Sequence, residues 1–250
     1  MRHFGLIGWP LGHSFSKKYF TEKFAREGIT DARYELFPLE NISSLPLLLE
    51  QNPELRGLNV TIPHKETVMA FLHHLDETAQ AVGAVNCIKI ENQKLRGFNT
   101  DVIGFEMSLK TMDGGRWTVD GSQALILGTG GAAKAVAFVL KKLGISFQFV
   151  SRNPKGENQI SYKDLSSLLI PHPSLLINTT PLGMSPNEDV CPDLPFEQLT
   201  PEHFVYDLIY NPAETLLLQR AKARGCTVKN GLEMLHLQAE AAWEIWNDET

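Results

Sequence analysis

The sequence predicts an α/β protein made of two domains. Short apolar runs alternate with helical stretches along the chain, which is typical of parallel sheets covered by helices. A polar segment at residues 113–121 interrupts this alternation, and a new apolar run follows it. Because 250 residues suffice for two domains of about 100 residues each, we expect one domain over residues 1–112 and a second over residues 113–231.

The composition argues against several classes of protein. Hydrophobic residues make up 43% and charged residues 21% of the chain, an ordinary balance for a soluble globular protein. The net charge of −6 gives no support to nucleic-acid or membrane-surface binding, and no apolar run approaches the roughly 20 residues that span a bilayer. The three cysteines are scattered without metal-ligand spacing, so we expect reduced thiols in a cytoplasmic protein and no metal site.

The first domain begins with a strand, because its opening apolar run is too short for a secretory signal. A hairpin turn is expected at Glu91–Lys94, between the last two strands of this domain. The expected strands are His3–Gly8, Arg33–Pro38, Gly57–Thr61, Ala84–Ile90 and Leu95–Phe98, and the expected helices are Ser16–Glu27, Lys65–Leu72 and Thr100–Met112.

The second domain continues the alternation from Ala124 onward. A final helical stretch, rich in alanine, leucine, glutamate and tryptophan, closes the chain. The expected strands are Ala124–Leu127, Phe147–Ser151, Leu175–Asn178 and Phe204–Leu208, and the expected helices are Ala132–Leu143 and Leu232–Trp246.

The most informative stretch is Asn59–Lys65, in which an apolar strand runs into a proline and then a lysine. Pro63 suits the first turn of a helix, where its missing N–H costs nothing. Lys65 would then lie near the positive end of the helix dipole, and a lysine whose charge is disfavoured is a candidate general acid–base. Taken alone, a lysine is more often a solvated surface residue.

A glycine-rich turn follows the first strand of the second domain. Gly128, Gly130 and Ala133 form a G-x-G-x-x-A pattern between an apolar strand and a helix. In a dinucleotide-binding turn the first glycine makes the tight bend, the second admits the pyrophosphate, and the helix N-terminus holds the phosphate charge. We therefore expect a nucleotide site at this turn.

The end of the next strand distinguishes between two dinucleotides. An NAD site usually carries Asp or Glu about 20 residues past the glycines, to bind the ribose hydroxyls. Here Ser151-Arg152-Asn153 stands instead, with Lys155 nearby and no acidic residue before Glu157. Because a guanidinium can bind a 2′-phosphate through its planar fork, NADP is the expected cofactor. The alternative is that both basic residues are solvated turn residues.

Two other polar stretches could either bind a ligand or cap a helix. Ser14 and Ser16 suit a small polyhydroxylated or carboxylated ligand, but either could cap the following helix. Thr100 and Asp101 could be a helix cap and its first-turn carboxylate. A ligand site is favoured because polar residues accumulate near predicted strand ends, where open α/β sheets bind ligands. These residues are Ser14, Ser16, Thr61, Lys65, Asn86 and Asp101.

Together these motifs resemble the shikimate dehydrogenase family over nearly the whole chain. Eight motifs occur in the family's order, which chance occurrence of one glycine-rich turn would not explain. They are HSxS at His13–Ser16, NVTIPHK at Asn59–Lys65, GAVN at Gly83–Asn86, GFNTD at Gly97–Asp101, GTGGAA at Gly128–Ala133, NTTPLGM at Asn178–Met184, DLIYNP at Asp207–Pro212 and GLEMLHLQA at Gly231–Ala239.

The resemblance implies an N-terminal substrate-binding domain, a Rossmann-like NADP-binding domain and a C-terminal helix, residues 232–250, that returns to the substrate domain. It implies reversible NADPH-dependent reduction of 3-dehydroshikimate to shikimate in chorismate and aromatic amino acid biosynthesis, by a monomer or homodimer, with Lys65 and Asp101 as the catalytic pair. The residues that match the family's shikimate ligands are Ser14, Ser16, Thr61, Asn86, Asp101, Tyr210 and Gln238. Those that match its NADP contacts are Glu77, Gly128, Thr129, Gly130, Gly131, Ala132, Ser151, Arg152, Asn153, Thr179, Thr180, Leu208 and Gly231.

The chain departs from the family's pattern in two places. After Ser16 the family usually continues with proline, whereas this chain has Lys17-Lys18, which changes the start of the helix. The cofactor strand usually ends in Asn-Arg-Thr, whereas this chain has Ser151-Arg152-Asn153. Both serines and the arginine remain, so we expect the same substrate class and a preference for NADP.

Three other functions are compatible with parts of the pattern. A quinate or dual quinate/shikimate dehydrogenase would use the same chemistry on a related acid. A folate-linked dehydrogenase also joins a lysine-bearing domain to a dinucleotide domain, but the HSxS and GFNTD motifs argue against it. A non-catalytic NADP-sensing protein could keep the fold, although the presence of Lys65 and Asp101 disfavours this function.

Overall fold

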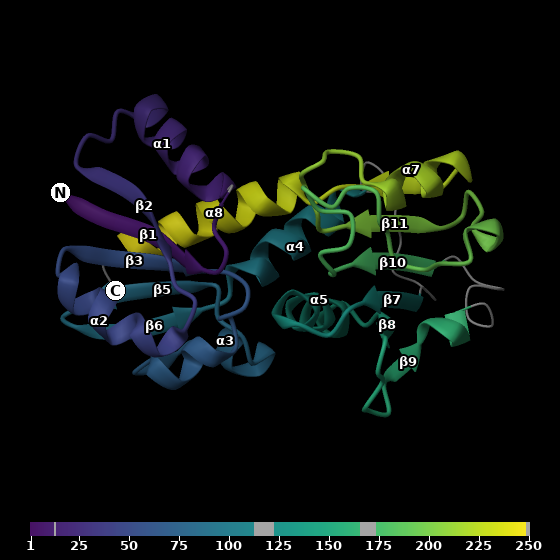
Figure 1. Cartoon of the computed structure of the whole chain (residues 1–250), viewed down its shortest axis with the longest axis horizontal. Helices are drawn as coiled ribbons and strands as arrows, with labels where there is room; N and C mark the ends of the chain where they lie inside the picture. Colours follow the sequence, from purple (N-terminus) through teal and green to yellow (C-terminus); the bar gives the residue numbers. More distant parts are fainter. Residues whose placement is uncertain (13, 113–122, 166–173, 249–250) are drawn as a thin grey trace. The chain divides into compact units, whose positions relative to one another are not determined.

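The computed structural model describes residues 1–12, 14–112, 123–165 and 174–248, and it forms two compact α/β units (Figure 1). The first unit comprises Met1–Thr100 and the C-terminal residues from Ala239 onward, and the second comprises Asp101–Gln238. The polar segment expected to separate the domains, residues 113–121, lies outside the described residues. The division at residue 112 therefore stays a prediction.

The first unit is built on a six-stranded mixed sheet in the order β2-β1-β3-β5-β6-β4. Strand β5 runs opposite to both of its neighbours. The antiparallel pairing of β5 with β6 agrees with the predicted hairpin, because a two-residue turn can join only antiparallel strands. The parallel sheet expected from the sequence is wrong between β3 and β5. The strands are β1 (Arg2–Gly8), β2 (Ala32–Pro38), β3 (Leu55–Val60), β4 (His74–Leu75), β5 (Cys87–Glu91) and β6 (Lys94–Phe98).

Helices cover both faces of this sheet. On one face, aromatic side chains of α1 and α8 pack against β1, where Phe4 stacks on Trp246 at 4.9 Å between ring centroids. On the other face, Leu45 at the start of α2 packs with Leu58 and Val68. The helix predicted at Ser16–Glu27 is confirmed, whereas α2 and α3 were not predicted. The elements are α1 (Phe15–Glu27), η1 (Ile42–Ser44), α2 (Leu45–Gln51), α3 (Glu77–Val82) and α8 (Leu232–Asn247).

The hairpin turn predicted at Glu91–Lys94 is confirmed. Glu91 pairs with Lys94, which leaves Asn92 and Gln93 as a two-residue turn. Their φ angles of 49° and 62° lie in the left-handed region that the commonest turns of this length require.

The helix predicted at Lys65–Leu72 is wrong. Residues 62–66 form turns, and a 3₁₀-helix, η2 (Thr67–Phe71), follows them. The amides of Met69 and Leu72 bond three residues back, to Glu66 and Met69, rather than four. Lys65 therefore lies in a turn with no α-helix dipole behind it, and Pro63 does not begin a helix.

The strand predicted at Ala84–Ile90 begins three residues later, at Cys87. Because β5 is antiparallel to β3, its first residue lies beside the end of β3, and Asn59 pairs with Cys87. Asn86 precedes its own strand, but it lies at the sheet edge where β1 and β3 end.

The second unit contains a six-stranded parallel sheet in the order β12-β11-β10-β7-β8-β9. This is the order of a doubly wound dinucleotide-binding sheet, and its direction of winding reverses between β7 and β10. Ligands bind at such a switch point, beyond the carboxyl ends of the strands. The strands are β7 (Gln123–Leu127), β8 (Ser146–Ser151), β9 (Gln159–Ser161), β10 (Ser174–Asn178), β11 (Phe204–Asp207) and β12 (Thr227–Lys229).

The predicted helices of the second unit are confirmed with small shifts of their ends. The face that packs on α7 is closed by buried leucine and valine side chains, including Leu125, Val205 and Leu217. Strands β9 and β12 and helix α7 were not predicted. The helical elements are α4 (Thr100–Lys110), α5 (Gly131–Lys142), η4 (Tyr162–Asp164), η5 (Phe196–Gln198) and α7 (Leu216–Ala223).

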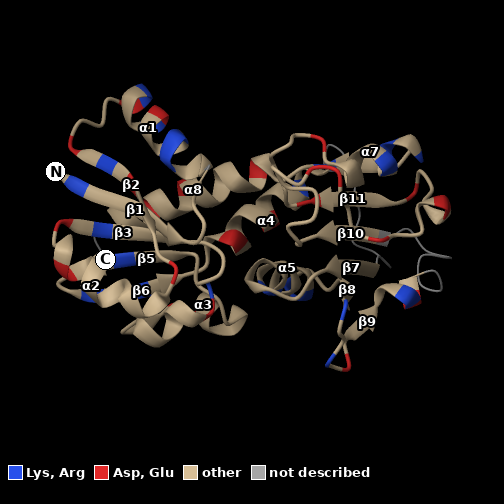
Figure 2. Cartoon of the chain, viewed as in Figure 1, with Lys and Arg blue, Asp and Glu red and all other residues tan. Residues whose placement is uncertain are grey.

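Acidic and basic side chains are interspersed over both units (Figure 2). Several form ion pairs, such as Glu106 with Lys110 at 2.8 Å and with Lys142 at 2.7 Å. Within the described part of the chain, no helix is both long enough and apolar enough to cross a membrane.

A glycine on β3 admits an aromatic side chain to the core of the first unit. A Cβ on Gly57 would lie 2.3 Å from Nε1 of Trp246, which donates a hydrogen bond of 3.0 Å to the Ile88 carbonyl. We expect Gly57→Ala to displace the indole and lower the free energy of unfolding by about 1–3 kcal/mol, measured by chemical denaturation. Gly12→Ala is the matched control, because no atom lies within 4 Å of its Cβ position. Equal costs for the two variants would contradict this packing constraint.

Candidate active site

The loops that leave β1 and β3 meet at the carboxyl edge of the first sheet. A Cβ on Gly8 would lie 2.3 Å from the Thr61 methyl group, and the Trp9 amide donates to the Ile62 carbonyl at 3.0 Å. Thr61 itself is tied back to β1 by a 2.9 Å bond from its amide to the Ile7 carbonyl. The serine loop and the threonine therefore share one end of this sheet.

The two serines of this loop differ in their surroundings. Ser14 occupies the N-cap position of α1, yet its side chain makes no capping hydrogen bond. Ser16 lies in the first turn of α1, and its influence on the Tyr34 phenol acts to lower the pKa of that group. The capping role that the sequence leaves open is thus not filled by the Ser14 side chain. His13, which opens the motif, lies outside the described residues.

A buried hydrogen-bond relay connects Tyr34 with Asn86 across the sheet. Tyr34 on β2 is buried, its ring stacks on Phe20 at 4.5 Å, and its hydroxyl donates to Asn59 Oδ1 at 2.8 Å. Asn59 Nδ2 in turn donates to the Asn86 carbonyl at 3.3 Å. Burial raises the pKa of Tyr34 well above its usual value, against the opposing effect of Ser16. The phenol therefore stays protonated and able to donate.

The Asn86 side chain forms the start of α4. Its Oδ1 accepts the Thr100 amide at 2.7 Å, and its Nδ2 donates to Thr100 Oγ1 at 3.0 Å. Asn86 is 2% exposed, so its side chain satisfies an N–H that a helix start would otherwise leave unpaired. Asp101 follows in the first turn of α4, where a carboxylate is stabilised by the helix dipole.

Lys65 is held through its backbone in the turn after β3. Its carbonyl accepts the Val85 amide at 2.7 Å, one residue before Asn86. The neighbouring His64 is buried, and its Nε2 bonds to the Leu39 carbonyl. The structure therefore brings the Lys65 turn next to the segment that carries Asn86, and the Lys65 side chain is partly exposed.

In the second unit, α4 and α8 approach closely at Gly104. A Cβ on Gly104 would lie 2.6 Å from the Met234 carbonyl and 3.0 Å from the Gln238 Cβ. Asp101 lies one turn before Gly104, and it is 6% exposed. This close approach brings the turn that carries Asp101 to the helix that carries Gln238. Tyr210 is partly buried in the loop after β11.

The glycine-rich turn has the geometry of a dinucleotide site. Gly128 follows β7 with a φ of 109°, and a Cβ there would lie 2.7 Å from Thr179 Oγ1. Gly130 is the N-cap of α5, and no atom lies within 4 Å of the place where its Cβ would be. Ala133 is fully buried against the sheet. The turn thus leaves open space at the helix N-terminus, where a pyrophosphate would bind. Thr129, Gly131 and Ala132 complete the turn.

Two buried polar side chains organise the other strand ends at the switch point. Asn178 ends β10, and its Oδ1 accepts both the amide and the hydroxyl of Thr180, at 3.0 and 2.7 Å. Its Nδ2 donates to Asp207 Oδ1 at 2.9 Å. Asp207 ends β11 and also accepts the Ile209 amide at 3.1 Å and the Thr215 hydroxyl at 2.6 Å. These bonds fix the loops that carry the predicted cofactor residues Thr179, Thr180 and Leu208.

Burial raises the pKa of Asp207 to about 6, although its three hydrogen bonds act in the opposite direction. The carboxyl group is fully buried, and this burial is the largest cause of the shift in its pKa. A negative charge at this position therefore carries a desolvation cost at neutral pH.

The remaining predicted cofactor residues lie in three places. Ser151 ends β8, its hydroxyl accepts the Asn153 amide at 3.2 Å, and Arg152 between them is exposed. Gly231 packs on the end of β11, since a Cβ there would lie 2.0 Å from the Leu208 carbonyl oxygen. Glu77 is an exposed residue in the first turn of α3, and it belongs to the first unit, unlike the others.

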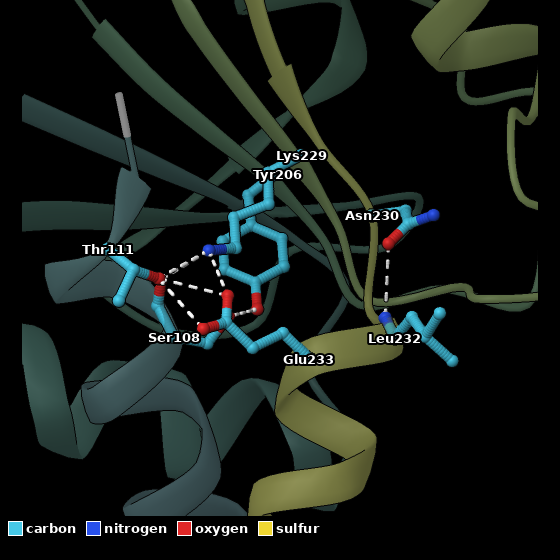
Figure 3. A network of polar contacts seen from close by, with 7 residues as sticks. All are labelled: Ser108, Thr111, Tyr206, Lys229, Asn230, Leu232 and Glu233. Carbon is cyan, nitrogen blue, oxygen red and sulfur yellow. Dashed lines mark hydrogen bonds and ion pairs between the residues drawn. The ribbon is translucent and has the colours of Figure 1, made fainter. Parts of the chain in front are cut away.

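The turn around Gly231 is flanked by a polar network that joins β11, β12, α4 and α8 (Figure 3). Lys229 Nζ donates to the Ser108 carbonyl and to Thr111 Oγ1, both at 2.7 Å, and pairs with Glu233. The Tyr206 hydroxyl and Ser108 Oγ are hydrogen-bonded at 2.7 Å. This network was not foreseen from the sequence.

Several residues that shape the site have no role in the sequence-based prediction. Asn59, Asn178 and Asp207 belong to quoted motifs, and Tyr34 lies outside them. A signal for three of them exists in the sequence, because each is a polar residue at or next to the end of an apolar strand. Nothing local marks Tyr34, whose partners are distant in sequence.

Comparison with known proteins gives a consistent result. A family model described as the shikimate dehydrogenase substrate binding domain matches residues 6–88. An NADP(+) shikimate dehydrogenase of Desulforamulus reducens is 38% identical over 261 residues, which cover 97% of this chain and 88% of that protein.

Solved structures agree with this result. A Thermus thermophilus shikimate 5-dehydrogenase, in complex with NADP(H) and shikimate, is 33% identical with a TM-score of 0.85, covering 99% of this chain and 94% of that one. A Listeria monocytogenes shikimate 5-dehydrogenase, in complex with shikimate and NAD, is 28% identical with a TM-score of 0.81, covering 98% and 91%.

The raised pKa of Asp207 predicts a pH-dependent stability. Because the pKa of about 6 in the folded protein lies above the ordinary aspartate pKa of 3.8, the folded state binds more protons between these pH values. The contribution of Asp207 to the free energy of unfolding therefore falls as pH rises from about 4 to 6, by roughly 3 kcal/mol in total. Asp207→Asn removes the charge, keeps an acceptor oxygen for Asn178 and Ile209, and places an NH₂ donor opposite the Thr215 hydroxyl, so that this one bond reverses its direction. Its stability relative to the natural protein should therefore rise across this window.

Chemical denaturation at pH 4.5 and 7.5 measures this difference. The exposed Asp189→Asn is the control and should show no such trend. A stability difference for Asp207→Asn that is the same at both pH values would contradict the raised pKa.

Proposed function

Since the chain belongs to the shikimate dehydrogenase family, we propose that it catalyses the reversible NADPH-dependent reduction of 3-dehydroshikimate to shikimate. One observation carries this proposal: the carboxyl edge of the first sheet gathers Thr61, the Lys65 turn and Asn86, and the helix that begins on Asn86 carries Asp101. Hydroxyl, amide, ammonium and carboxylate groups suit a small polyhydroxylated acid, which both donates and accepts hydrogen bonds.

The second unit fits NADP. Open space at Gly130, the positive φ of Gly128 and the buried Ala133 match what a pyrophosphate at a helix N-terminus requires. The exposed Arg152 after β8 would bind the 2′-phosphate, in place of the acid that would bind a free ribose hydroxyl. NADPH, when bound, supplies the hydride that reduces the substrate carbonyl, and NADP⁺ takes it up in the reverse direction.

Lys65 acts as the general acid and base of this reaction. The ammonium group donates a proton to the carbonyl oxygen as negative charge develops on it, which completes the new hydroxyl group. In the reverse direction the neutral amine takes the hydroxyl proton. Asp101 is the second member of the pair, and its carboxylate, buried at the start of α4, binds a substrate hydroxyl.

The proposed substrate ligands are Ser14, Ser16, Thr61, Asn86, Asp101, Tyr210 and Gln238. One of them, Asn86, is fixed by contacts that do not depend on the substrate, because its side chain is held by Thr100. Since such a side chain loses little freedom on binding, it costs the complex little conformational entropy.

The proposed activity is tested by measuring the oxidation of shikimate and quinate, each with NADP⁺ and with NAD⁺. We expect shikimate with NADP⁺ to be the fastest pair. Arg152→Ala should raise the KM for NADP⁺ about 10- to 100-fold, the effect of losing a charged hydrogen bond, and leave the KM for NAD⁺ nearly unchanged. Lys163→Ala removes another exposed cation and serves as the control.

Faster oxidation of quinate would reassign the substrate. Equal effects of Arg152→Ala on both cofactors would refute the 2′-phosphate contact, and no turnover of either acid would favour a non-catalytic NADP-binding protein.

Lys65→Ala tests the proton transfer. We expect kcat to fall by about 10²–10⁴, the usual contribution of a general acid–base, while shikimate still binds in a calorimetric titration. Lys65→Arg keeps the charge but is a poor proton donor at neutral pH, so its kcat should also remain low. A near-normal kcat in Lys65→Ala would remove this lysine from the mechanism.

A further inference from the structure

A polar clamp, formed by Ser108, Thr111, Tyr206, Lys229 and Glu233, lies within the second unit (Figure 3). Its centre is the Lys229 ammonium, which reaches the Ser108 carbonyl, the Thr111 hydroxyl and the Glu233 carboxylate. The Thr111 hydroxyl is also 2.9 and 3.1 Å from the two Glu233 oxygens. The Lys229 side chain is only 16% exposed, so these contacts are partly shielded from solvent screening.

The clamp encloses the turn that carries Gly231. Lys229 ends β12, Glu233 lies in the first turn of α8, and the two are joined side chain to side chain across the turn between them. Within that turn, Asn230 Nδ2 donates to the Ala213 carbonyl at 2.8 Å, and its Oδ1 accepts the Leu232 amide at 3.2 Å. The Gly231 amide donates to the Ile209 carbonyl at 3.0 Å. The turn is therefore fixed from both sides against the end of β11.

The same clamp joins the two helices that carry proposed substrate residues. Ser108 lies in the last turn of α4, where carbonyl groups lack helical partners and a lysine is favoured by the helix dipole. Glu233 lies beside it, in the first turn of α8, and its carboxylate is 3.4 Å from Ser108 Oγ. Further along both helices, α4 and α8 touch again at Gly104 and Gln238. Because a helix transmits position along its length, fixing the end of α4 also fixes Asp101 at its start.

We propose that Lys229 and Glu233 are positioning residues for hydride transfer, which hold the Gly231 turn in one arrangement with Asp101 on α4 and Gln238 on α8. This inference rests on the proposed function of those three residues. Neither Lys229 nor Glu233 is assigned to the substrate or the cofactor, and both act through the backbone of the turn and the ends of the two helices. Their loss should therefore affect the rate of the chemical step more than the affinity for NADPH, whose phosphates are bound at the glycine turn and Arg152.

Lys229→Met tests this proposal, because it removes the ammonium and keeps the apolar stem. We expect kcat to fall 10- to 100-fold, while the Kd for NADPH, measured by fluorescence titration, changes less than threefold. The primary deuterium isotope effect on kcat should rise, because hydride transfer becomes slower than product release. In the cofactor-free protein, amide hydrogen exchange of residues 230–235 should become faster. Lys229→Arg keeps charged donors and should recover most of kcat.

The control is Lys222→Met, which breaks the 3.0 Å ion pair with Glu214 on the same unit. It should change none of these measurements. Glu233→Gln is the second variant if Lys229→Met fails to fold, and it should lower kcat and raise the isotope effect in the same direction.

The outcomes separate this inference from the proposed function. A natural protein that does not turn over shikimate refutes the proposed function. If the natural protein oxidises shikimate but the folded clamp variants show unchanged kcat, isotope effect and amide exchange, only the positioning role of Lys229 and Glu233 is refuted. A loss of NADPH affinity as large as the loss of kcat would also refute this role, because the clamp would then only maintain the fold of the second unit.

Discussion

The hydrogen bond between the Asn178 and Asp207 side chains is the contact on which the cofactor edge of this protein depends. It joins the last residues of two neighbouring parallel strands, β10 and β11, at the point where the sheet reverses its winding. Each partner then fixes a loop, through Thr180 on one side and through Ile209 and Thr215 on the other. Displacing either loop would break several of these hydrogen bonds at once. Each buried polar group left without a partner would then cost about 1–3 kcal/mol. The cost of this arrangement is a buried carboxyl group whose pKa is raised to about 6.

In the first unit, the loops at the substrate edge are also fixed by side chains at strand ends, although the sheet there is mixed rather than parallel. Its substrate edge is formed by the ends of β1 and β3 and by the start of β5, because β5 runs against β3. Asn86 therefore lies at the same edge as the ends of β1 and β3. If β5 ran parallel to β3, its first residue would lie at the opposite edge of the sheet. Its side chain then holds the first residue of α4, and its carbonyl accepts Asn59, which is bonded to Tyr34. In both units, an asparagine at a strand end connects a core hydrogen-bond network to a loop or helix with a proposed ligand contact.

Patterns that depend on neighbouring residues could be predicted from the sequence. The longer strands, the hairpin at Glu91–Lys94 and the glycine turn at Gly128 were found in this way, because their signals are local: apolar runs, turn residues, and glycine between a strand and a helix. The short strands β4, β9 and β12, of two or three residues each, were not predicted. The exceptions have equally local causes. After Lys65 the Val68 amide bonds four residues back, whereas those of Met69 and Leu72 bond three residues back, so a 3₁₀-helix stands where an α-helix was expected. The helix dipole first invoked for Lys65 is therefore absent, and its proposed role depends on its place at the sheet edge.

The sequence by itself determined the α/β class, the dinucleotide turn and the identity of the residue types that could bind a polyhydroxylated acid and NADP. Only the tertiary structure decided which of these groups are fixed by hydrogen bonds, and which residues provide those bonds. The reversed direction of β5, the relay from Tyr34 through Asn59 to Asn86, and the contacts of Lys229 with α4 all join residues that are far apart in the chain. The physical reason is that hydrogen bonds between distant segments depend on strand order and direction, and these follow from burying two faces of each sheet at once rather than from any local pattern.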